Sequence, residues 1–354
     1  MNASAFDVLI VGLGPAGTSA AIKAAEAGLS VLAIDKRRKL GCPVQCAEFV
    51  PLPMGRYARP ALVQRIEGMR SILPSGACER SDFPGLMVDR ALFDQALATE
   101  ASKAGALLRV HTALKGFDDG GQAAILRGPD GGIERAQYRV LIAADGPHST
   151  VARAIGLAPL ETVETRQYQM PLLRPYADTD IWLSDDYPGG YGWLFPKGEV
   201  ANVGIGASLR LVTDLKAPLE RLCANVARTG VIGREILART GGAIPVGGMR
   251  HPLVHGNIMF AGDAAGLTHP ITGAGIASAV ISGERAGQAA AEYVAGQDGA
   301  LARFAEDIRD EFEDSLMRAV ARRRWLMERW HTPAAHMDAT HKRGWVAFRE
   351  YFAA

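Results

Sequence analysis

The fold of this chain is specified near its N-terminus by the stretch Val8-Leu9-Ile10-Val11-Gly12-Leu13-Gly14-Pro15-Ala16-Gly17. The first four residues form an apolar run of strand length, which is typical of a buried parallel strand. Gly12 allows a tight turn, Gly14 lets the backbone approach a pyrophosphate, and Gly17 lets the next helix pack on the strand. The pattern predicts the first strand, turn and helix of a dinucleotide-binding sheet.

The residues after this turn complete the unit. An Ala-rich helix is expected over residues 16–27, with Gly28 as its C-cap. The free N–H groups and partial positive charge at the start of this helix suit a phosphate. A second strand over residues 30–34 ends at Asp35, whose carboxylate is expected to accept hydrogen bonds from ribose hydroxyls. Lys36, the next residue, is also expected to contact the cofactor.

A second glycine-rich signature, Ala261-Gly262-Asp263-Ala264-Ala265, follows another apolar run about 250 residues later. Gly262 allows close backbone approach, and Asp263 can accept a hydrogen bond from a ribityl hydroxyl. Gly273-Ala274-Gly275-Ile276 then opens a helix whose positive end can face a flavin. A third signature, Asp145-Gly146, follows an expected strand over residues 138–144, and both a plain turn and a cofactor contact remain open there.

Composition sets outer limits on function. The chain has 354 residues, 48% of them hydrophobic, so a large core and two lobes are expected. A formal net charge of +1 implies neither nucleic acid nor an acidic partner. No apolar run is long enough for a transmembrane helix, and the first strand starts too early to leave room for a signal peptide. With four cysteines, a reducing cytoplasm is expected.

The three signatures resemble those of flavoproteins with the glutathione-reductase-type fold, in the branch shared by aromatic hydroxylases and geranylgeranyl reductases. Hydroxylases usually carry His after Gly-Asp-Ala-Ala, where this chain has Gly266. The chain is instead similar to geranylgeranyl reductases over about residues 6–295. The segments that carry this similarity are Pro188-Gly189-Gly190-Tyr191-Gly192-Trp193-Leu194-Phe195-Pro196-Lys197-Gly198, the cysteine loop with Gly41, Pro43, Cys46, Ala47 and Glu48, and Val88-Asp89-Arg90 with Phe93-Asp94.

The resemblance implies FAD as the cofactor and assigns roles to individual residues. Those expected to hold the dinucleotide are Ala16, Asp35, Arg90, Asp263, Gly275 and Ile276, together with Gly12, Gly14, Gly17, Lys36, Asp145, Gly262 and Gly273 from the signatures. Cys46 and Ala47 would lie near the isoalloxazine, and the backbone of Leu114 near the adenine. Tyr191, Trp193 and Phe195 would line a cavity for an apolar chain, although strand aromatics are also common core residues. No metal site is expected.

The expected fold class is α/β: a Rossmann-like FAD-binding domain with an inserted antiparallel β-sheet substrate domain and a short helical C-terminal tail. The FAD-binding domain is expected at 1–68, 87–157 and 247–300, the substrate domain at 69–86 and 158–246, and the tail at 301–354. Further helices are expected over residues 88–105, 215–227, 276–295 and 301–330.

The chemistry requires an electron source and a proton donor. A single dinucleotide fingerprint implies that electrons come from transiently bound NAD(P)H or from reduced ferredoxin, the latter a redox partner protein. An unpolarised double bond needs a proton besides a hydride, and Cys46, Glu48 and Tyr191 are the candidate donors. Cys46 could equally be a buried structural thiol. A redox pair with Cys42 is conceivable, but Cys42 is not part of the family pattern. Three functions stay open: a reductase of apolar double bonds, a monooxygenase acting on an aromatic or a peptide side chain, and an electron-transfer flavoprotein.

The C-terminal tail leaves further alternatives open. Arg322-Arg323-Arg324-Trp325 and Trp330 lie on an expected helix and could form a solvated face, a partner site or a peripheral membrane contact for a lipid substrate. The tail is shorter than is common in the family, so the substrate pocket is expected to be open or differently closed. His269, in the loop after the second signature, could approach the flavin.

Overall fold

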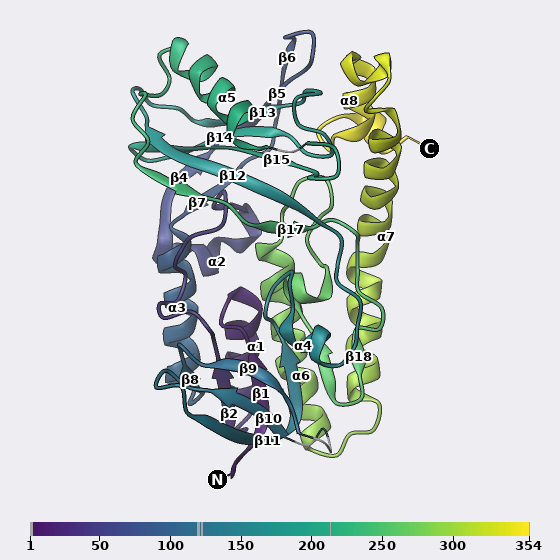
Figure 1. Cartoon of the computed structure of the whole chain (residues 1–354). Coiled ribbons are helices and arrows are strands. Elements are labelled where there is room, and N and C mark those ends of the chain that lie inside the picture. The colour runs from purple at the N-terminus through teal and green to yellow at the C-terminus, as the bar shows by residue number, and fades with distance from the viewer. Residues whose placement is uncertain (1–2, 119–120, 122, 213, 354) are drawn as a thin grey trace.

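The computed structural model describes residues 3–118, 121, 123–212 and 214–353. Two lobes are stacked along the long axis of the molecule, and one long helix, α7 (Ala300–Arg329), runs beside both (Figure 1). The N-terminus lies at the far end of the first lobe, while the last residues lie beside the second lobe.

The first lobe is built on an eight-stranded sheet with a parallel centre. Its path runs in the order β18-β19-β11-β1-β2-β8, and every neighbouring pair except β18–β19 is parallel. An antiparallel extension, β9 and β10, pairs with β11. The strands are β1 (Ala3–Val11), β2 (Val31–Ile34), β8 (Leu107–Arg109), β9 (Ala113–Phe117), β10 (Ala123–Arg127), β11 (Ile133–Ala143), β18 (Val254–His255) and β19 (Ile258–Phe260).

The register of this sheet brings the three signatures to one edge. Val11 pairs with both Ile34 and Ala143, and Ala143 pairs with Phe260. The loops that follow these four strands therefore leave the sheet together, at the carboxyl ends of the strands, where ligands bind in open α/β sheets.

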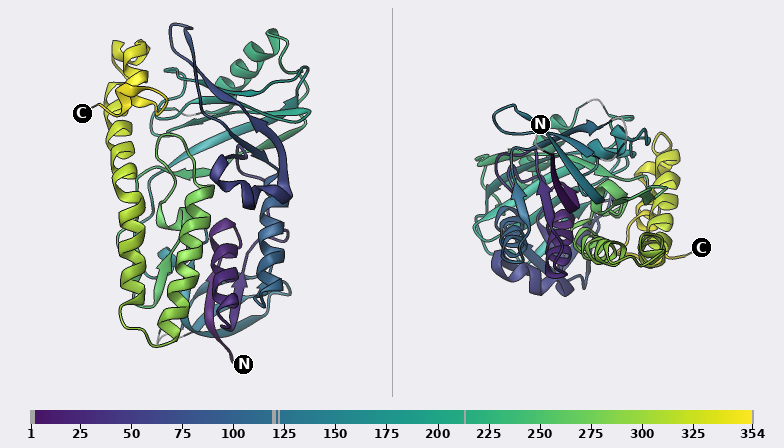
Figure 2. Two further views of the ribbon diagram at one scale, coloured as in Figure 1. Left: turned by 180° about the vertical axis from the view of Figure 1, so that it is seen from behind. Right: turned by 90° about the horizontal axis from the view of Figure 1, so that it is seen from below.

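Four helices lie in a row along one face of this sheet, as the view from below shows (Figure 2). They are α3 (Arg90–Lys103), α1 (Pro15–Glu26), α6 (Ile276–Val294) and α7. Small residues let α1 and α6 approach closely: a Cβ on Gly283 would lie 2.1 Å from the Ala16 carbonyl oxygen, and one on Gly287 would lie 2.4 Å from that of Ala20. The Ala and Gly content of both segments thus has a packing reason.

The second lobe is an eight-stranded, mostly antiparallel sheet in the order β16-β12-β15-β14-β13-β5-β6, with β17 also on β12. One pair, β13–β5, is parallel, which the sequence did not indicate. The helix α5 (Lys216–Arg228) packs on this sheet. The strands are β5 (Gly68–Ile72), β6 (Cys78–Ser81), β12 (Thr162–Pro171), β13 (Asp178–Trp182), β14 (Gly192–Lys197), β15 (Val200–Ala207), β16 (Ala238–Thr240) and β17 (Ala243–Pro245).

Smaller elements connect the lobes. A three-stranded antiparallel sheet is formed by β3 (Phe49–Pro51), β7 (Gly85–Val88) and β4 (Leu62–Ile66). The Pro-containing segment 39–60 holds β3 and also the short helix α2 (Gly55–Ala58). The other short helices are α4 (Thr150–Ala154) and α8 (Asp338–Gly344). All five expected longer helices are present, with ends within two residues of those expected.

The C-terminal tail folds back onto the second lobe. Trp345 and Phe348 are buried in one cluster with Trp193 and Phe195 of β14. The expected helical tail is confirmed, and the residues after α7 also pack against β14, far earlier in the chain.

Candidate active site

The first glycine-rich turn combines two packing glycines with one open position. Gly12 has a φ of +104°, and a Cβ there would lie 2.2 Å from the Ala144 carbonyl oxygen. A Cβ on Gly17 would lie 1.8 Å from the Gly12 carbonyl oxygen. A Cβ on Gly14 would meet nothing within 4 Å, and no side chain caps the helix α1 that begins there. Gly14 thus offers open space and free N–H groups, which fit a phosphate.

Asp35 directly follows β2 and stabilises the first glycine-rich turn by hydrogen bonds. Its carboxylate accepts hydrogen bonds from the backbone N–H groups of Leu13 at 3.0 Å and Arg37 at 2.7 Å. Thr112 donates its backbone N–H to the Asp35 carbonyl at 2.9 Å, so the start of β9, with Leu114, runs beside it. Lys36 is exposed. The expected adenosine contacts therefore lie at one edge of the sheet.

Asp145 caps a helix and keeps one free oxygen. Its Oδ2 accepts from the backbone N–H groups of Thr150 at 2.6 Å and Val151 at 3.1 Å, at the start of α4. Its Oδ1 is buried and has no hydrogen-bond partner among the described residues. Burial raises the pKa of this carboxyl, and the bonds from α4 oppose that shift. Asp145 is thus both a turn residue and a buried acceptor with spare capacity.

The second signature meets the first in space. A Cβ on Gly262 would lie 2.9 Å from that of Ala16. Asp263 accepts a hydrogen bond from the Thr268 hydroxyl at 2.6 Å, and a Cβ on Gly275 would lie 3.2 Å from its Oδ1. Burial raises the pKa of Asp263, and the nearby Arg90 guanidinium lowers it.

The helix α6 begins directly beside this carboxylate. Ile276 is its first residue, and the N-cap Gly275 offers no side chain to its free N–H groups. Gly273 lies in the same loop with a φ of +68°. Two uncapped helix N-termini, the open space at Gly14 and the spare oxygen of Asp145 therefore fit a dinucleotide that extends from the first signature to the second.

The cysteine loop lies between the two lobes. The Cys46 sulfur accepts the backbone N–H of Glu48 at 3.1 Å. The Cys46 carbonyl accepts from Gln167 of β12 at 3.1 Å, and Gln167 in turn accepts the Trp193 indole N–H at 2.9 Å. Burial raises the pKa of the Cys46 thiol, and the Arg90 guanidinium beside it lowers it. Cys42 and Cys46 are both free thiols.

Arg90 is fixed at the start of α3. Its guanidinium donates two hydrogen bonds to Asp94, each at 3.1 Å, and both side chains are largely buried. Bidentate pairing of this kind fixes orientation as well as charge. The cation is thereby held near Cys46 of the cysteine loop and near Asp263 of the second signature.

Glu48 joins the cysteine loop to the second sheet. Its buried carboxylate accepts from Lys197 of β14 at 2.8 and 2.9 Å, from the Asn202 amide at 2.8 Å, and from the backbone N–H of Arg90 at 2.9 Å. Glu48 itself has a φ of +72°, a conformation that non-glycine residues rarely adopt. Each oxygen of this carboxylate thus accepts two hydrogen bonds.

Three aromatic residues share one face of the strand region 191–195. Tyr191 donates its hydroxyl to the Thr272 carbonyl at 2.5 Å, in the loop before α6. Trp193 and Phe195 are buried, and Phe195 packs against Phe49 with ring centroids 5.9 Å apart. Only Tyr191 of the three lines the cavity described next.

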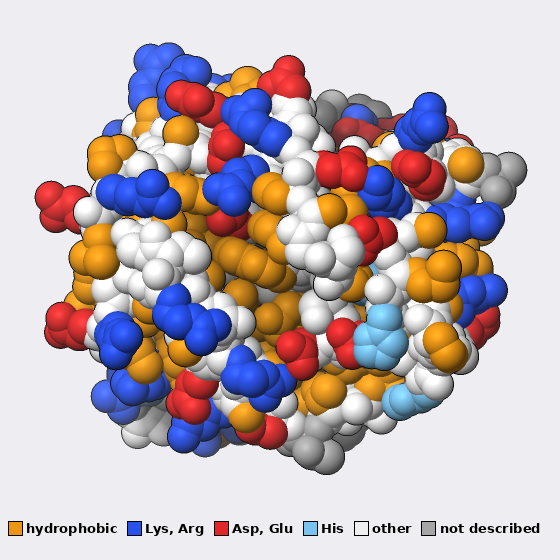
Figure 3. All heavy atoms as spheres, turned by 90° about the horizontal axis from the view of Figure 1, so that it is seen from above, with side chains coloured by type: hydrophobic (Ala, Val, Ile, Leu, Met, Phe, Trp, Pro, Cys, Tyr) orange, Lys and Arg blue, Asp and Glu red, His pale blue; other side chains and the backbone are white. Residues whose placement is uncertain are grey.

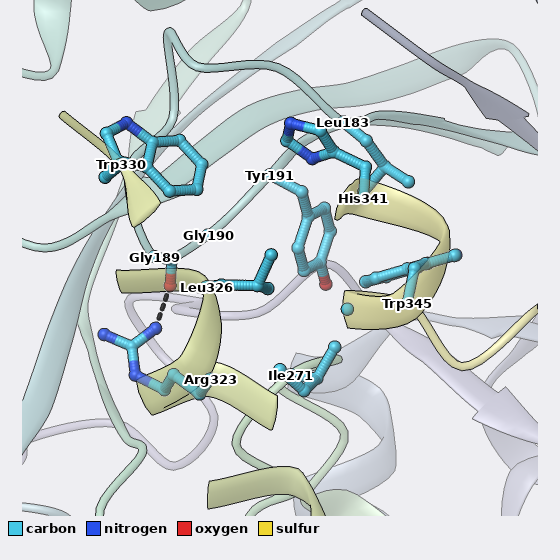
Figure 4. Close-up of a pocket in the computed structure, with 11 residues that line it drawn as sticks. Leu183, Gly189, Gly190, Tyr191, Ile271, Arg323, Leu326, Trp330, His341 and Trp345 are labelled. Atoms are coloured by element: carbon cyan, nitrogen blue, oxygen red, sulfur yellow. Dashed lines mark hydrogen bonds between the residues drawn. The ribbon is translucent and has the colours of Figure 1, made fainter. Parts of the chain in front are cut away.

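A cavity of about 20 Å³ lies between Tyr191 and the C-terminal helices (Figure 4). Ile271, from the loop after Asp263, forms one side of it, and Trp345 stacks edge-on against Tyr191 with centroids 4.9 Å apart. Seen from above, this end of the molecule has a hollow lined by hydrophobic side chains and surrounded by charged ones (Figure 3). The C-terminal tail thus forms part of the wall of the cavity beside Tyr191.

His269 organises the loop before α6. Its Nδ1 accepts from the backbone N–H groups of Ile271 and Thr272, each at 3.3 Å, and its Nε2 lies 3.5 Å from the Tyr351 hydroxyl in the tail. Burial lowers the pKa of His269 to about 4, so the ring is neutral at physiological pH. The His269 ring thus fixes the loop before α6 and lies against the C-terminal tail.

Several residues of this site had no assigned role in the sequence analysis. Gln167, Lys197 and Asn202 are ordinary strand residues in sequence, and only strand pairing brings them to the cysteine loop. Arg323 is buried, so it does not lie on a solvated face of the helix, whereas its neighbour Arg324 is exposed. Trp325 stacks under the guanidinium of Arg329, at 4.2 Å from the ring centroid.

Family models agree with this layout. One described as FAD dependent oxidoreductase matches residues 7–108, one described as FAD binding domain matches residues 78–187, and one described as geranylgeranyl reductase catalytic domain matches residues 165–243. Fold and site thus define an FAD-dependent oxidoreductase.

Individual relatives show to which family of FAD-dependent oxidoreductases the chain belongs. A digeranylgeranylglycerophospholipid reductase from Methanocella arvoryzae is 36% identical over 88% of this chain and 85% of its own. A geranylgeranyl bacteriochlorophyll reductase-like protein from Thermoplasma acidophilum is 32% identical, with a TM-score of 0.85 over 92% of this chain and 88% of its own. The chain belongs to the geranylgeranyl reductase family.

More distant structures share the fold alone. A flavin-dependent brominase superposes with a TM-score of 0.73 over 93% of this chain and 88% of its own, at 20% identity. Within the described residues, no helix is both long and apolar enough to span a membrane.

Proposed function

We propose that this protein reduces carbon–carbon double bonds of a polyprenyl lipid. The observation that carries the proposal is the meeting of Cys46, Tyr191 and the loop before α6 on the apolar side of the second sheet. A Cβ on Gly273 of that loop would lie 4.0 Å from the Tyr191 hydroxyl. The relatives are named digeranylgeranylglycerophospholipid reductases, which supports the same substrate class.

FAD, when bound and reduced, supplies a hydride to one carbon of the double bond. The protein must place a proton on the other carbon, and we assign this role to the Cys46 thiol. Because burial raises its pKa, the thiol keeps its proton at neutral pH until the alkene requires it. The thiolate left behind faces the Arg90 cation and regains a proton from water.

The two other candidate donors are poorly suited. Glu48 is a carboxylate that already accepts from Lys197, Asn202 and the Arg90 backbone. The Tyr191 proton is already donated to the Thr272 carbonyl at 2.5 Å. Cys46 alone of the three combines an available proton with a neighbouring cation.

The proposed cofactor contacts follow the edge of the first sheet. The adenosine half would lie against Asp35, Lys36 and the backbone of Leu114, and the pyrophosphate at Gly12, Gly14, Ala16 and Gly17. The flavin half would lie between the cysteine loop, with Ala47 and Arg90, and the residues Asp145, Gly262, Asp263, Gly273, Gly275 and Ile276. Trp193 and Phe195 would support the substrate wall from behind Tyr191.

The electron donor and the access route complete the proposal. One dinucleotide fingerprint favours transiently bound NAD(P)H or reduced ferredoxin over a built-in nicotinamide domain. A lipid substrate also favours peripheral contact with a membrane. Anaerobic mixing of the oxidised holoenzyme with NADH, NADPH or reduced ferredoxin identifies the donor by bleaching of the flavin absorbance.

The test of function is anaerobic reduction of a geranylgeranyl substrate by dithionite-reduced holoenzyme. We expect mass spectrometry to show a gain of two hydrogens for each bond reduced, with no oxygen incorporated in air. Cys46→Ala should slow the reduction by about 10²- to 10⁴-fold, the usual contribution of a positioned acid, while dithionite still bleaches the flavin.

Cys42→Ala is the matched control, since it removes a thiol from the same loop. We expect it to keep full activity. An equal loss in both variants would indicate a redox pair instead, and a product with one added oxygen and no added hydrogen would transfer the assignment to the monooxygenase class.

A further inference from the structure

The cavity beside Tyr191 is too small for the substrate proposed above. Its volume of about 20 Å³ holds one water molecule. A prenyl chain that passes Tyr191 toward the flavin therefore requires one wall of the cavity to move outward.

The walls of the cavity differ in how firmly they are built. Tyr191 directly precedes β14, an inner strand that pairs with a neighbour on each side. Leu326 belongs to the 30-residue helix α7, and Ile271 lies in the loop that His269 fixes. Trp345 belongs to neither a sheet nor a long helix, because it follows the seven-residue helix α8. The wall at Trp345 is therefore the one that we expect to move.

Residues 333–353, here called the tail segment, are joined to the other elements by side chains. In the part of the chain that the structure describes, each backbone–backbone hydrogen bond of the tail segment has its partner within residues 332–353. A segment that shares no backbone bonds with its surroundings opens at a lower free-energy cost than a strand inside a sheet.

One end of the tail segment is held by the hairpin of β5 and β6. Asp338 accepts hydrogen bonds from the backbone N–H of Ser75 at 3.0 Å and from its hydroxyl at 2.6 Å. The Lys342 ammonium lies 2.5 Å from the Glu79 carboxylate, and the two side chains are 27% and 45% exposed. Exposed ion pairs contribute little stability, so this end of the segment can detach and return.

The other end contacts the loop before α6. The Tyr351 hydroxyl lies 3.5 Å from Nε2 of His269, the residue whose Nδ1 accepts from the N–H groups of Ile271 and Thr272. Thr272 in turn accepts the Tyr191 hydroxyl. The tail segment is thus connected to the substrate wall through the same loop that leads to the flavin side.

The middle of the tail segment is apolar and faces the second sheet. Trp345 and Phe348 are buried in the cluster that contains Trp193, and Trp345 lies edge-on to Tyr191 with ring centroids 4.9 Å apart (Figure 4). The Trp345 indole N–H is buried without a hydrogen-bond partner among the described residues. Because an unpartnered buried donor is costly, this side chain gains a water partner when the segment moves outward.

We propose that the tail segment is a lid, and that the prenyl chain enters where this lid separates from β14, between Trp345 and Tyr191. This inference rests on the proposed function and specifies how the apolar substrate reaches the site. Opening breaks the two contacts with the β5–β6 hairpin and withdraws Trp345 from Tyr191.

Hydrogen–deuterium exchange of the FAD-saturated protein without substrate tests whether the lid opens. In the wild-type protein we expect the tail segment to exchange faster than β14 and α7. Lys342→Glu and Glu79→Lys each replace the ion pair by a like-charge contact, so each should speed exchange in the tail segment by about 3- to 10-fold. The double variant, with the charges swapped, should return toward the wild-type rate.

The control is Lys216→Glu, which reverses the lysine of an exposed pair with Glu220 in α5 of the same lobe. This variant should leave exchange in the tail segment unchanged.

Stopped-flow mixing of the oxidised holoenzyme with uncharged geranylgeraniol tests whether the lid is the entrance. Tryptophan fluorescence reports binding, so the readout does not depend on turnover. Because association requires the open state, its rate should rise in both single variants by the same factor as the exchange rate and fall again in the double variant.

Exchange in the tail segment as slow as in β14 would overturn the lid, and the wild-type protein alone decides this point if a variant does not fold. Faster exchange in the single variants without faster association, or without any binding of geranylgeraniol, would overturn its role as the entrance. A folded double variant that behaves like the single variants would overturn the role of the Glu79 pair in holding the lid. Lid-dependent association without reduction of any alkene would instead reject the proposed function and leave the lid standing.

Discussion

The Lys197 ammonium lies 2.8 Å from one oxygen of the buried Glu48 carboxylate and 2.9 Å from the other, and the Lys197 side chain is only 11% exposed. Glu48 belongs to the cysteine loop and Lys197 to the last position of β14, so this ion pair fixes the loop to the second sheet. The pair also holds the backbone beside Cys46 in a left-handed conformation that Glu would otherwise avoid.

Breaking this buried pair should be costly. We expect Lys197→Met to lower the free energy of unfolding by about 3–5 kcal/mol, because Glu48 is left as a buried charge without its cation. Urea unfolding of the FAD-saturated protein gives the measurement. The control is Lys103→Met, which removes a lysine paired at the same 2.9 Å with exposed Glu100 and should cost less than about 1 kcal/mol. Similar losses in the two variants would show that the Glu48 pair adds no special stability.

Substitution of Gly14 and of Gly17 by alanine should affect different properties, FAD affinity in the first case and protein stability in the second. Gly14→Ala adds a methyl group that meets no protein atom at an ordinary φ of −78°, so we expect an unchanged melting temperature without FAD and weaker FAD binding. Gly17→Ala places a methyl group 1.8 Å from a backbone oxygen and should destabilise the protein itself by about 1–3 kcal/mol. FAD titration and thermal unfolding of the apoprotein separate the two effects. Normal FAD affinity in Gly14→Ala would place the pyrophosphate elsewhere.

Trp193 should act through its hydrogen bond as well as its volume. Trp193→Phe leaves the Gln167 amide oxygen without its donor, and we expect a loss of about 1–3 kcal/mol in stability with the flavin spectrum retained. Because Gln167 also holds the Cys46 carbonyl, the rate of alkene reduction should fall too. Phe195→Leu is the matched control, because it replaces an aromatic side chain on the same strand, one that makes no hydrogen bond, by a smaller apolar one. A Trp193→Phe protein with full stability and activity would make the link from Trp193 to Cys46 irrelevant.

His269 should make stability depend on pH. Its pKa is about 4 in the folded protein and about 6.5 when unfolded, so between these values the unfolded chain binds a proton that the folded chain does not. Stability therefore falls as the pH drops from about 6.5 to 4, by at most about 3 kcal/mol from this residue. Urea unfolding at pH 7 and pH 4.5 should show a smaller difference in His269→Gln than in the wild-type protein. Exposed His148→Gln serves as the control, and a wild-type pH dependence in His269→Gln would assign the effect to other groups.

Local sequence determined the elements that carry the cofactor signatures. The strand, the glycine turn and the helix at residues 8–26 follow from apolar periodicity and from the absence of side chains at Gly12 and Gly17. The same reasoning found α3, α5, α6 and α7, because long helices with a regular apolar period are specified by nearby residues. The family could be recognised from the same short motifs.

Tertiary structure decided which distant residues meet. The parallel pairing of β13 with β5 and the pairing of β12 with β15 depend on contacts across the lobe, where hydrophobic patterns alone do not fix the partner. Lys197 and Gln167 reach the cysteine loop only through that pairing. The burial of Arg323 depends on α7 packing against the loop at Gly189, since a helix with three consecutive arginines shows in its sequence no preference for which of them turns inward. The charge of each residue is a property of the sequence, but its burial is a property of the packed chain.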